Sequence, residues 1–238
     1  MRIEGRPEDP VIPALSVVIP ALNAAATLPA TLAALGRVPA EVVVVDGGSR
    51  DGSADLAGQL GALVVRAPRG RGGQLAAGAA AARGPWLLLL HADTVLAPGW
   101  GDAVRHAMRD PGRAAYFRFA LDDAAPAARR LERAVAWRCR VLALPYGDQG
   151  LLIHRDLLGA VGGIRPLPLM EDVELIRRLG RARLVALPVA AVTSAARWRA
   201  QGYLRRSARN LGCLALWFLG VPPRIIARVY AGRGAGKG

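Results

Sequence analysis

Residues 41–53 read EVVVVDGGSRDGS, and this stretch decides the fold class. Its apolar run, Glu41–Val45, is typical of a strand that is buried on both faces of a sheet. The glycine- and aspartate-rich segment after it is typical of a turn, and a short helix is expected from Ser53. A buried strand, a polar turn and a helix make up one unit of a parallel α/β sheet.

The same unit recurs on both sides of this stretch. Further strands are predicted at Leu15–Ile19, Ala62–Arg66 and Trp86–Leu90. A helix capped by Asn23 is expected to run through Leu35, and an alanine-rich helix is expected over about 74–83. Apolar strands that alternate with helices predict an α/β fold, with a mostly parallel sheet and helices on both of its faces.

The second half of the chain is less regular. Two strands are predicted, at Ala114–Leu121 and at LLIH after the GDQG segment 147–150. A basic helix is expected over Pro126–Leu144, and another over MEDVELIRRL (170–179), which has acids in its first turn and arginines in its last, as the helix dipole favours. Residues 200–219 are predicted to form one basic, amphipathic helix.

Positive charge is concentrated toward the C-terminus. The chain has 238 residues, of which 32 are basic and 18 acidic, for a net charge of +14. After Glu174 there are 13 basic residues and no acidic one. Charge of one sign attracts phosphates, anionic lipid or nucleic acid, although the excess of arginine can equally reflect codon bias. Because aromatic residues, which a nucleic-acid binder interleaves with its arginines, are only 5%, no nucleic-acid partner is expected.

The helix expected over 200–219 has two interpretations. In both, its apolar residues pack on the core while Arg205, Arg206 and Arg209 face outward, either into water only or onto anionic lipid. The first ten residues do not resemble a signal peptide, and the apolar run Leu211–Val221 has about half the length of a bilayer span. The expected location is the cytoplasm, with peripheral contact to the inner face of the membrane.

Chemically useful side chains follow three of the predicted strands, at the edge where parallel sheets bind ligands. Asp46 can accept hydrogen bonds from a base or ribose, although DGGS is also ordinary turn chemistry. The segment RGRGGQ (69–74) offers arginines and backbone N–H groups to a phosphate. Asp93 in HADT can bind Mg²⁺ or Mn²⁺ together with a diphosphate, or it can cap the next turn.

Two common nucleotide-binding motifs are absent from the sequence. The 69–74 loop lacks the G-K-[ST] ending of a P-loop, and no G-x-G-x-x-G follows the first strand. Glu171 and Asp172, at a helix start, can supply a general base or can simply favour the helix dipole. The two cysteines exclude a disulfide scaffold and cannot by themselves hold a structural zinc.

Five segments taken together resemble a known family. They are VVIPALNAAATLPATL (17–32), VVVVDGGSRDGS (42–53), LLLLHADT (87–94), GDQG (147–150) and MEDVEL (170–175). In order and spacing they are similar to family 2 glycosyltransferases of the GT-A fold, from about Leu15 to Trp198. The chain most resembles a subgroup of small bacterial enzymes that is labelled arsenosugar-biosynthesis glycosyltransferases.

The resemblance implies a role for each matching position. HAD stands where the family has D-x-D, so Asp93 matches the ligand of a divalent metal, Mn²⁺ or Mg²⁺, and His91 replaces the first acid. Asp172 matches the catalytic base, with Glu171 beside it. The nucleotide-sugar donor is expected to contact Pro20, Ala21, Leu22, Asn23, Asp46, Arg71, Gln74, His91, Ala92 and Asp93. The acceptor or the diphosphate is expected to contact Gly147, Asp148, Gln149, Arg197 and Trp198.

The resemblance also implies a domain plan and an activity. A GT-A domain is expected over 1–198, with a nucleotide-sugar half at about 15–110 and an acceptor half at about 111–198, followed by a basic helical extension (199–230) and a disordered tail (231–238). The expected reaction is inverting transfer of a sugar from a nucleoside diphosphate sugar, first a UDP-sugar, to a hydroxyl of a small or lipid-linked acceptor. A nucleotidyltransferase acting on a sugar phosphate and a nucleic-acid-binding protein are the alternatives.

Overall fold

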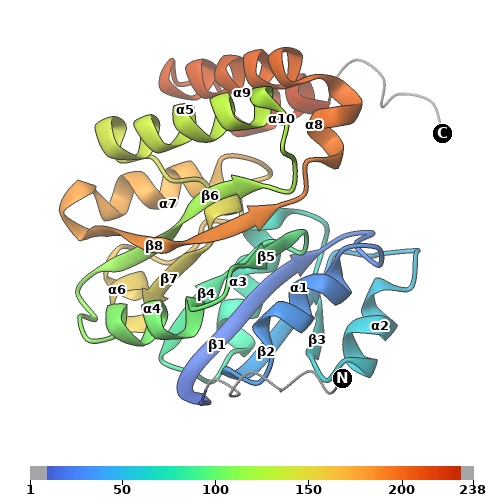
Figure 1. The fold of residues 1–238 in the computed structure, drawn as a ribbon, viewed down its shortest axis with the longest axis vertical. Helices are drawn as coiled ribbons and strands as arrows, with labels where there is room; N and C mark the ends of the chain where they lie inside the picture. Colours follow the sequence, from blue (N-terminus) through green and yellow to red (C-terminus); the bar gives the residue numbers. More distant parts are fainter. Residues whose placement is uncertain (1–9, 232–238) are drawn as a thin grey trace, which may run out of the picture.

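The structure is a computed structural model, and it describes residues 10–231. One eight-stranded sheet runs through the molecule in the order β3-β2-β1-β4-β7-β6-β8-β5 (Figure 1). Its strands are β1 (Ile12–Ala21), β2 (Pro39–Asp46), β3 (Leu63–Arg66), β4 (Trp86–Leu89), β5 (Thr94–Leu96), β6 (Ala114–Leu121), β7 (Leu151–His154) and β8 (Leu184–Thr193).

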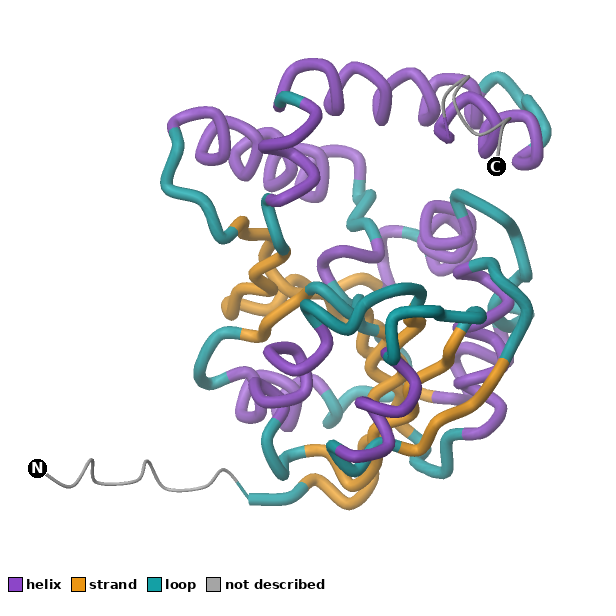
Figure 2. Tube along the Cα trace, turned by 90° about the vertical axis from the view of Figure 1, so that its right-hand side faces the viewer, coloured by secondary structure: helices purple, strands orange, loops and turns teal. Residues whose placement is uncertain are grey.

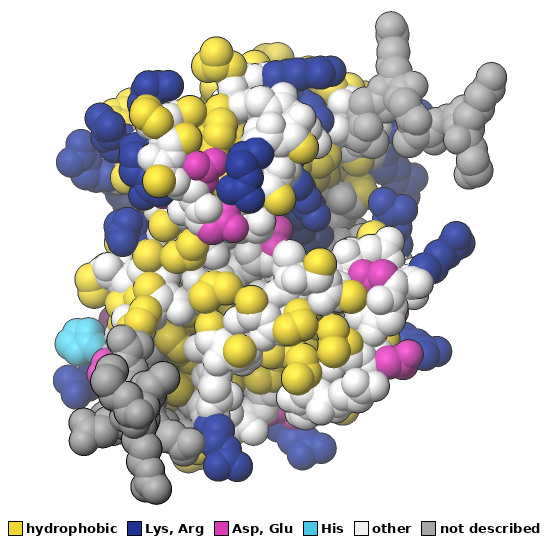
Figure 3. Space-filling view, turned by 45° about the vertical axis from the view of Figure 1, so that its right-hand side comes forward, with side chains coloured by type: hydrophobic (Ala, Val, Ile, Leu, Met, Phe, Trp, Pro, Cys, Tyr) yellow, Lys and Arg dark blue, Asp and Glu magenta, His cyan; other side chains and the backbone are white. Residues whose placement is uncertain are grey.

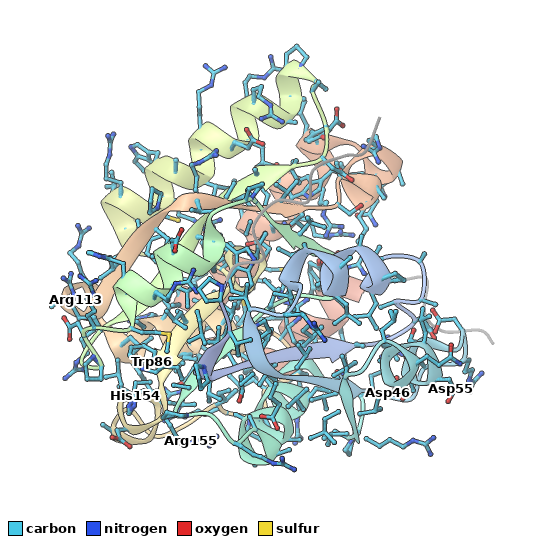
Figure 4. All side chains as sticks on the ribbon, turned by 60° about the horizontal axis from the view of Figure 1, so that its bottom comes forward. Asp46, Asp55, Trp86, Arg113, His154 and Arg155 are labelled. Carbon is cyan, nitrogen blue, oxygen red and sulfur yellow. The ribbon has the colours of Figure 1, made fainter. Side chains whose placement is uncertain are left out.

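The four strands predicted in the first half form the parallel part of the sheet, from β3 to β4. Val43, Val44 and Val45 of β2 are buried, as a continuous apolar run predicts. The register pairs Ala21 with Asp46 and Asp46 with Arg66, so the carboxyl ends of β1, β2 and β3 meet at one edge. Figure 4 shows Asp46 at this edge and Trp86 and His154 at the opposite end of the sheet.

The rest of the sheet mixes the two strand directions. β7 is antiparallel to β4 and to β6, β5 is antiparallel to β8, and β6 and β8 are parallel. Four of the seven neighbouring pairs are parallel, which confirms a mostly parallel sheet. The register pairs Leu89, at the end of β4, with Leu151, at the start of β7. The GDQG segment before β7 therefore lies beside the HAD segment after β4, although the two are far apart in the chain.

Helices cover both faces of the sheet, which confirms the predicted α/β class. One face packs against α1 (Leu28–Leu35), α2 (Ser53–Gln59) and α4 (Trp100–Ala107). The other face packs against α3 (Arg71–Ala81), α6 (Arg155–Ala160) and α7 (Glu171–Leu179). Gly78 lets α3 approach the sheet closely, because a Cβ at this position would lie only 2.3 Å from Cγ1 of Val18.

The first helix begins later than predicted. It starts at Leu28, because Asn23 does not act as its N-cap. Asn23 has a φ of +49°, and its Oδ1 accepts a hydrogen bond from the backbone N–H of Arg50 at 2.9 Å. Its side chain therefore joins the loop after β1 to the loop after β2.

A layer of helices lies above β6 and β8 (Figure 1, Figure 2). It consists of α5 (Pro126–Leu142), α8 (Ala196–Gln201), α9 (Tyr203–Phe218) and α10 (Pro223–Ala231). The helix predicted over 200–219 is observed as α9, but it begins later than predicted, because Gly202, with a φ of +80°, separates α9 from α8. The expected boundary after residue 198 falls within α8, and residues 232–238 of the expected tail lie outside the described residues. Between residues 10 and 231, no helix combines the length and the apolarity that crossing a membrane requires.

Candidate functional site

A cavity of about 420 Å³ opens where β1 and β4 end, and we call it the strand-end cavity. Nine of the ten residues predicted to contact a donor line it: Pro20, Ala21, Leu22, Asn23, Arg71, Gln74, His91, Ala92 and Asp93. Arg69, Ser194 and Arg197 add to the same wall. The shared edge of the parallel strands thus brings polar side chains from distant segments around one open space.

Asp46 and Gln74 build the edge of this cavity. Asp46 is buried and does not line the cavity, and its carboxylate accepts two backbone N–H groups of the turn that follows it, each at 3.1 Å. Gln74 is also buried, and its Nε2 donates to the backbone oxygens of Ala21 at 2.9 Å and Val45 at 2.8 Å. The structure therefore places both side chains as supports that hold the strand ends and their loops.

The loop after β2 contains supporting residues that the sequence analysis did not identify. Oγ of Ser49 accepts the backbone N–H of Asn23, and Oδ2 of Asp51 accepts that of Ala25, both at 2.9 Å. Hydrogen bonds from Ser53 and Ala25 lower the pKa of Asp51. These bonds hold the loop after β1, which lines the strand-end cavity. The SRDGS pattern is typical of a turn and carries no signal for contacts at this sequence distance.

A second cavity, of about 140 Å³, lies against α8, α9 and α10, and we call it the helix-covered cavity. The two cavities meet at the residues that line both: Arg71, His91, Asp93, Ser194 and Arg197. Three further predicted residues line the helix-covered cavity: Asp148, Asp172 and Trp198. Sequence reasoning missed its wall from α9 and α10, which consists of Arg206, Asn210, Cys213 and Tyr230.

Asp172 lies in the first turn of α7 and lines the helix-covered cavity. Its Oδ2 accepts the backbone N–H of Gly147 at 2.8 Å, and its Oδ1 accepts that of Val173 at 2.8 Å. Gly147 begins a 3₁₀ turn, η1 (Gly147–Gln149), so the GDQ and MED segments are in direct contact. The two hydrogen bonds hold the carboxylate in one orientation against the cavity.

Glu171, the neighbouring acid, is directed differently. It is buried, it lines neither the strand-end cavity nor the helix-covered cavity, and its Oε1 lies 3.5 Å from Nε of Arg71 on α3. Burial, together with the Asp172 carboxylate, raises the pKa of Glu171 to about 7, against the opposing effect of Arg71. Of the two adjacent acids, Asp172 is the one that a molecule in the helix-covered cavity can reach.

The two polar side chains of the GDQ segment have different surroundings. Gln149 is buried. Its Nε2 donates to the backbone oxygen of Phe117 at 3.0 Å, and its Oε1 accepts the backbone N–H of Tyr146 at 3.2 Å. It therefore holds the turn in place, and it lines neither the strand-end cavity nor the helix-covered cavity. Asp148 lines the helix-covered cavity, and its Oδ1 is buried without a hydrogen-bond partner. Burial raises the pKa of Asp148 to about 6, although the guanidinium of Arg138 opposes the shift.

His91 and Asp93 lie where the two cavities meet. Burial, followed by the charges of Arg71 and Arg197, lowers the pKa of His91 well below its ordinary value. Among residues 10–231, no three His, Cys, Asp or Glu side chains gather as a metal-binding group. Asp93 is thus a single carboxylate donor, with Asp148 facing the same cavity. This donor set fits Mg²⁺ or Mn²⁺, which commonly complete their coordination with water and substrate phosphate oxygens.

One protein-family model matches the chain, and it is described as Glycosyl transferase family 2. The match covers residues 16–165, which run from β1 through α6. Asp172 and the helices α8–α10 therefore lie beyond the matched region. No curated protein sequence matches the chain.

Several solved structures share the fold. TarS 1–349 of S. aureus in complex with UDP has a TM-score of 0.59 at 15% identity, over 76% of this chain and 61% of that one. Glucosyl-3-phosphoglycerate synthase from Mycobacterium tuberculosis, in complex with Mn²⁺ and UDP-glucose, has a TM-score of 0.60 at 21% identity, over 88% of this chain and 80% of that one. Mannosyl-3-phosphoglycerate synthase from Rubrobacter xylanophilus has a TM-score of 0.57 at 17% identity, over 87% of this chain and 75% of that one. These identities show a shared fold alone, and this chain spans less than two thirds of the TarS chain.

Proposed function

The chain belongs to glycosyl transferase family 2 and has the GT-A fold, and from this premise we propose that it transfers a sugar from a nucleoside diphosphate sugar to an acceptor hydroxyl, with inversion at the anomeric carbon. One observation carries the proposal: the strand-end and helix-covered cavities meet at Asp93, and Asp172 faces the second of them. A donor and an acceptor can therefore occupy separate spaces that meet beside a fixed carboxylate.

We assign the donor to the strand-end cavity. Its volume of about 420 Å³ is within the range of small-ligand pockets, and strand ends are where α/β sheets bind nucleotides. Arg71 and Arg197 line the junction of the two cavities, where they can bind a diphosphate. UDP is the first nucleotide to test, because the TarS and glucosyl-3-phosphoglycerate synthase structures hold UDP and UDP-glucose. That the chain belongs to the arsenosugar-biosynthesis subgroup stays a proposal based on shared motifs, and we infer no substrate from it.

In the proposed step, the acceptor oxygen attacks the anomeric carbon and forms the new glycosidic bond. The bond between that carbon and the diphosphate oxygen breaks, and the nucleoside diphosphate leaves with the electron pair. Asp172 accepts the proton of the hydroxyl, while Arg71 and Arg197 stabilise the charge that gathers on the diphosphate. A divalent cation held by Asp93 would supply Lewis-acid stabilisation of the same charge.

A panel of nucleoside diphosphate sugars tests the proposed function. A UDP-sugar with Mn²⁺ is expected to raise the melting temperature of the protein and to be turned over with release of UDP. A nucleotidyltransferase would instead form pyrophosphate from a nucleoside triphosphate and a sugar phosphate. A nucleic-acid-binding protein would be stabilised by an oligonucleotide and not by UDP. If no member of the panel binds or reacts, the proposal is wrong.

Gly147→Ala is expected to impair transfer while the protein stays folded. A Cβ at this position would lie 2.8 Å from Nε2 of His91 and 3.3 Å from Oδ2 of Asp172, so the groups at the site must move. We expect kcat to fall by at least about tenfold, since a displacement of about 1 Å near the reacting atoms can cost about 10²-fold. Steady-state kinetics and the melting temperature check this result. Gly159→Ala is the matched control, because no atom would lie within 4 Å of its Cβ. A wild-type kcat in Gly147→Ala would contradict the assigned site.

Three positions of α9 have the reverse of the expected orientation. Leu204 is 88% exposed and Leu211 is 63% exposed, whereas Arg206 is buried against the helix-covered cavity. The expectation that the apolar residues of this helix pack on the core and its arginines face outward is therefore wrong for these positions. Figure 3 shows apolar and arginine side chains together over the layer of helices at the top of the molecule.

We propose that this face makes peripheral contact with an anionic membrane, in keeping with the expected place on the inner membrane surface. The exposed leucines can insert between lipid headgroups, as the apolar face of an interfacial helix does. Exposed arginines of α9 and of the adjoining α10 carry the charge opposite to that of the lipid: Arg205, Arg224 and Arg228. No acidic residue follows Glu174, so nothing in α8–α10 repels an anionic surface.

Liposome co-sedimentation tests this contact. The wild type is expected to bind vesicles that contain anionic lipid, and to bind them more weakly as salt rises. Leu204→Ser combined with Leu211→Ser is expected to reduce vesicle binding by about tenfold or more, because each substitution removes apolar side-chain area that the bilayer would bury. Leu60→Ser, at an exposed leucine outside the helical layer, is the control. Absence of binding even at low salt would refute the proposal.

A further inference from the structure

Arg206 is a buried arginine in the wall of the helix-covered cavity. It is only 9% exposed, and its hydrogen bonds go to neutral groups: Nη1 to Oε1 of Gln201 at 3.1 Å, and Nη2 to the hydroxyl of Tyr230 at 3.4 Å. Its guanidinium lies 5.0 Å from the ring centroid of Trp198, and its Nε is buried without a hydrogen-bond partner. Within the part of the chain that the structure describes, no carboxylate forms an ion pair with it.

Further positive charge surrounds Arg206. Arg209, on the same helix, lies 4.8 Å from the ring centroid of Tyr230 and donates to Oε1 of Gln201 at 2.6 Å. Arg197 lines the same cavity. Burial lowers the pKa of Arg206, and so do the charges of Arg197 and Arg209, with only Tyr230 opposing them. A buried charge without a counter-charge is costly, so this wall of the cavity favours an anion.

The position of Arg206 separates it from the diphosphate site assigned above. Arg71 and Arg197 line both cavities, whereas Arg206 and Asp172 line the helix-covered cavity and not the strand-end cavity. An anion bound at Arg206 therefore shares its space with the carboxylate that is assigned to the acceptor hydroxyl. The same molecule can reach both groups.

We propose that the acceptor is a phosphorylated molecule whose phosphate binds to Arg206 while its reacting hydroxyl lies at Asp172. This inference rests on the proposed glycosyltransferase function and names the acceptor class. The planar guanidinium matches the geometry of phosphate oxygens. Arg197 and Arg206 line this cavity and Arg209 adjoins it through Gln201, and their combined charge suits a group that carries about −1.5 to −2 charges at neutral pH. The Oδ1 of Asn210, buried and without a partner, can accept a hydrogen bond from a hydroxyl of the same molecule.

Inorganic phosphate is the probe that tests this site. It is titrated calorimetrically into protein saturated with UDP and Mg²⁺, so that the donor site is filled, and the titration is repeated with chloride at equal ionic strength. We expect the wild type to bind phosphate and Arg206→Gln to bind it at least about tenfold more weakly, because charge-assisted hydrogen bonds are lost. Arg205→Gln is the matched control: it makes the same change of charge at the neighbouring, exposed position and is expected to keep wild-type phosphate affinity.

Equal phosphate affinity in Arg206→Gln and Arg205→Gln overturns the inference, and so does a phosphate effect no larger than that of chloride. UDP binding by Arg206→Gln shows that this variant is folded. If it does not bind UDP, Arg206→Lys replaces it. A lysine keeps the positive charge but lacks the planar guanidinium. The inference then requires that Arg206→Lys binds phosphate more weakly than the wild type while it still binds UDP. A wild type that does not bind UDP defeats the proposed function instead, and the phosphate titration then compares the same variants without UDP.

A second arm distinguishes a lipid-borne phosphate from a soluble one. Phosphatidylcholine vesicles with phosphatidic acid are offered to the UDP-loaded protein. The control in this arm is Arg113→Gln, which removes an exposed arginine outside the layer of helices. If Arg206→Gln weakens vesicle binding about tenfold relative to Arg113→Gln, the phosphate is that of a lipid headgroup. If these two variants bind vesicles equally while Arg206→Gln weakens binding of inorganic phosphate, the acceptor is a soluble phosphorylated molecule.

Discussion

Asp172→Asn is expected to lower kcat by about 10²–10⁴-fold while affinity for the donor stays close to that of the wild type. An asparagine keeps the size of the side chain, and its amide oxygen can still accept the backbone N–H of Gly147, so the contact between α7 and η1 survives. What is lost is the group that we propose as acceptor of the hydroxyl proton. We assign the donor to the strand-end cavity, which Asp172 does not line.

Steady-state kinetics with a UDP-sugar, together with calorimetric binding of UDP, measure the two halves of this prediction. Glu171→Gln is the informative comparison, because the two acids are neighbours in sequence and Glu171 is directed at Arg71. We expect Glu171→Gln to cost far less turnover than Asp172→Asn. The reverse order would move the general base from Asp172 to Glu171.

Asp93→Ala is expected to abolish transfer and to remove the dependence of nucleotide affinity on a divalent cation. Asp93 lines both cavities, and it is the carboxylate at their junction, in the short segment between β4 and β5. Without it, a cation would have to be held by the diphosphate and by Asp148, which belongs to a different segment. Nucleotide binding that does not involve the cation should persist, because the loops after β1 and β2 are built without Asp93.

Titration of UDP with and without Mn²⁺, for wild type and Asp93→Ala, checks this expectation. The wild type should bind UDP more tightly with Mn²⁺ than without it, and the variant should bind equally in both. Asp102→Ala removes a carboxylate that is 77% exposed on α4, and it controls for the change of net charge. Equal affinity of the wild type with and without Mn²⁺ would refute a metal site at Asp93.

The sequence by itself determined the parallel half of the fold and most of the donor side of the site. Strands buried on both faces need continuous apolar runs, and those runs became β1, β2 and β4, while the run at 62–66 became the partly exposed edge strand β3. Parallel strands end at a common edge, so the polar residues after them had to meet there, as the register of Ala21 with Asp46 shows. Nine of the ten residues that the family resemblance assigned to a donor line the strand-end cavity, and the common edge of the parallel strands explains why they lie together.

Tertiary structure alone decided the other side of the site. The antiparallel return of β7 places Gly147 against Asp172, and no pattern within either segment shows that pairing. The first turn of α7 carries two acids, and only the positions of α3 and η1 determine that Glu171 meets Arg71 while Asp172 faces the cavity. Likewise, an amphipathic pattern shows that the two faces of α9 differ but not which of them lies inward. The inward face is chosen by what lies beneath the helix, and here that is a cavity with charged walls, so Arg206 turns in and Leu204 turns out.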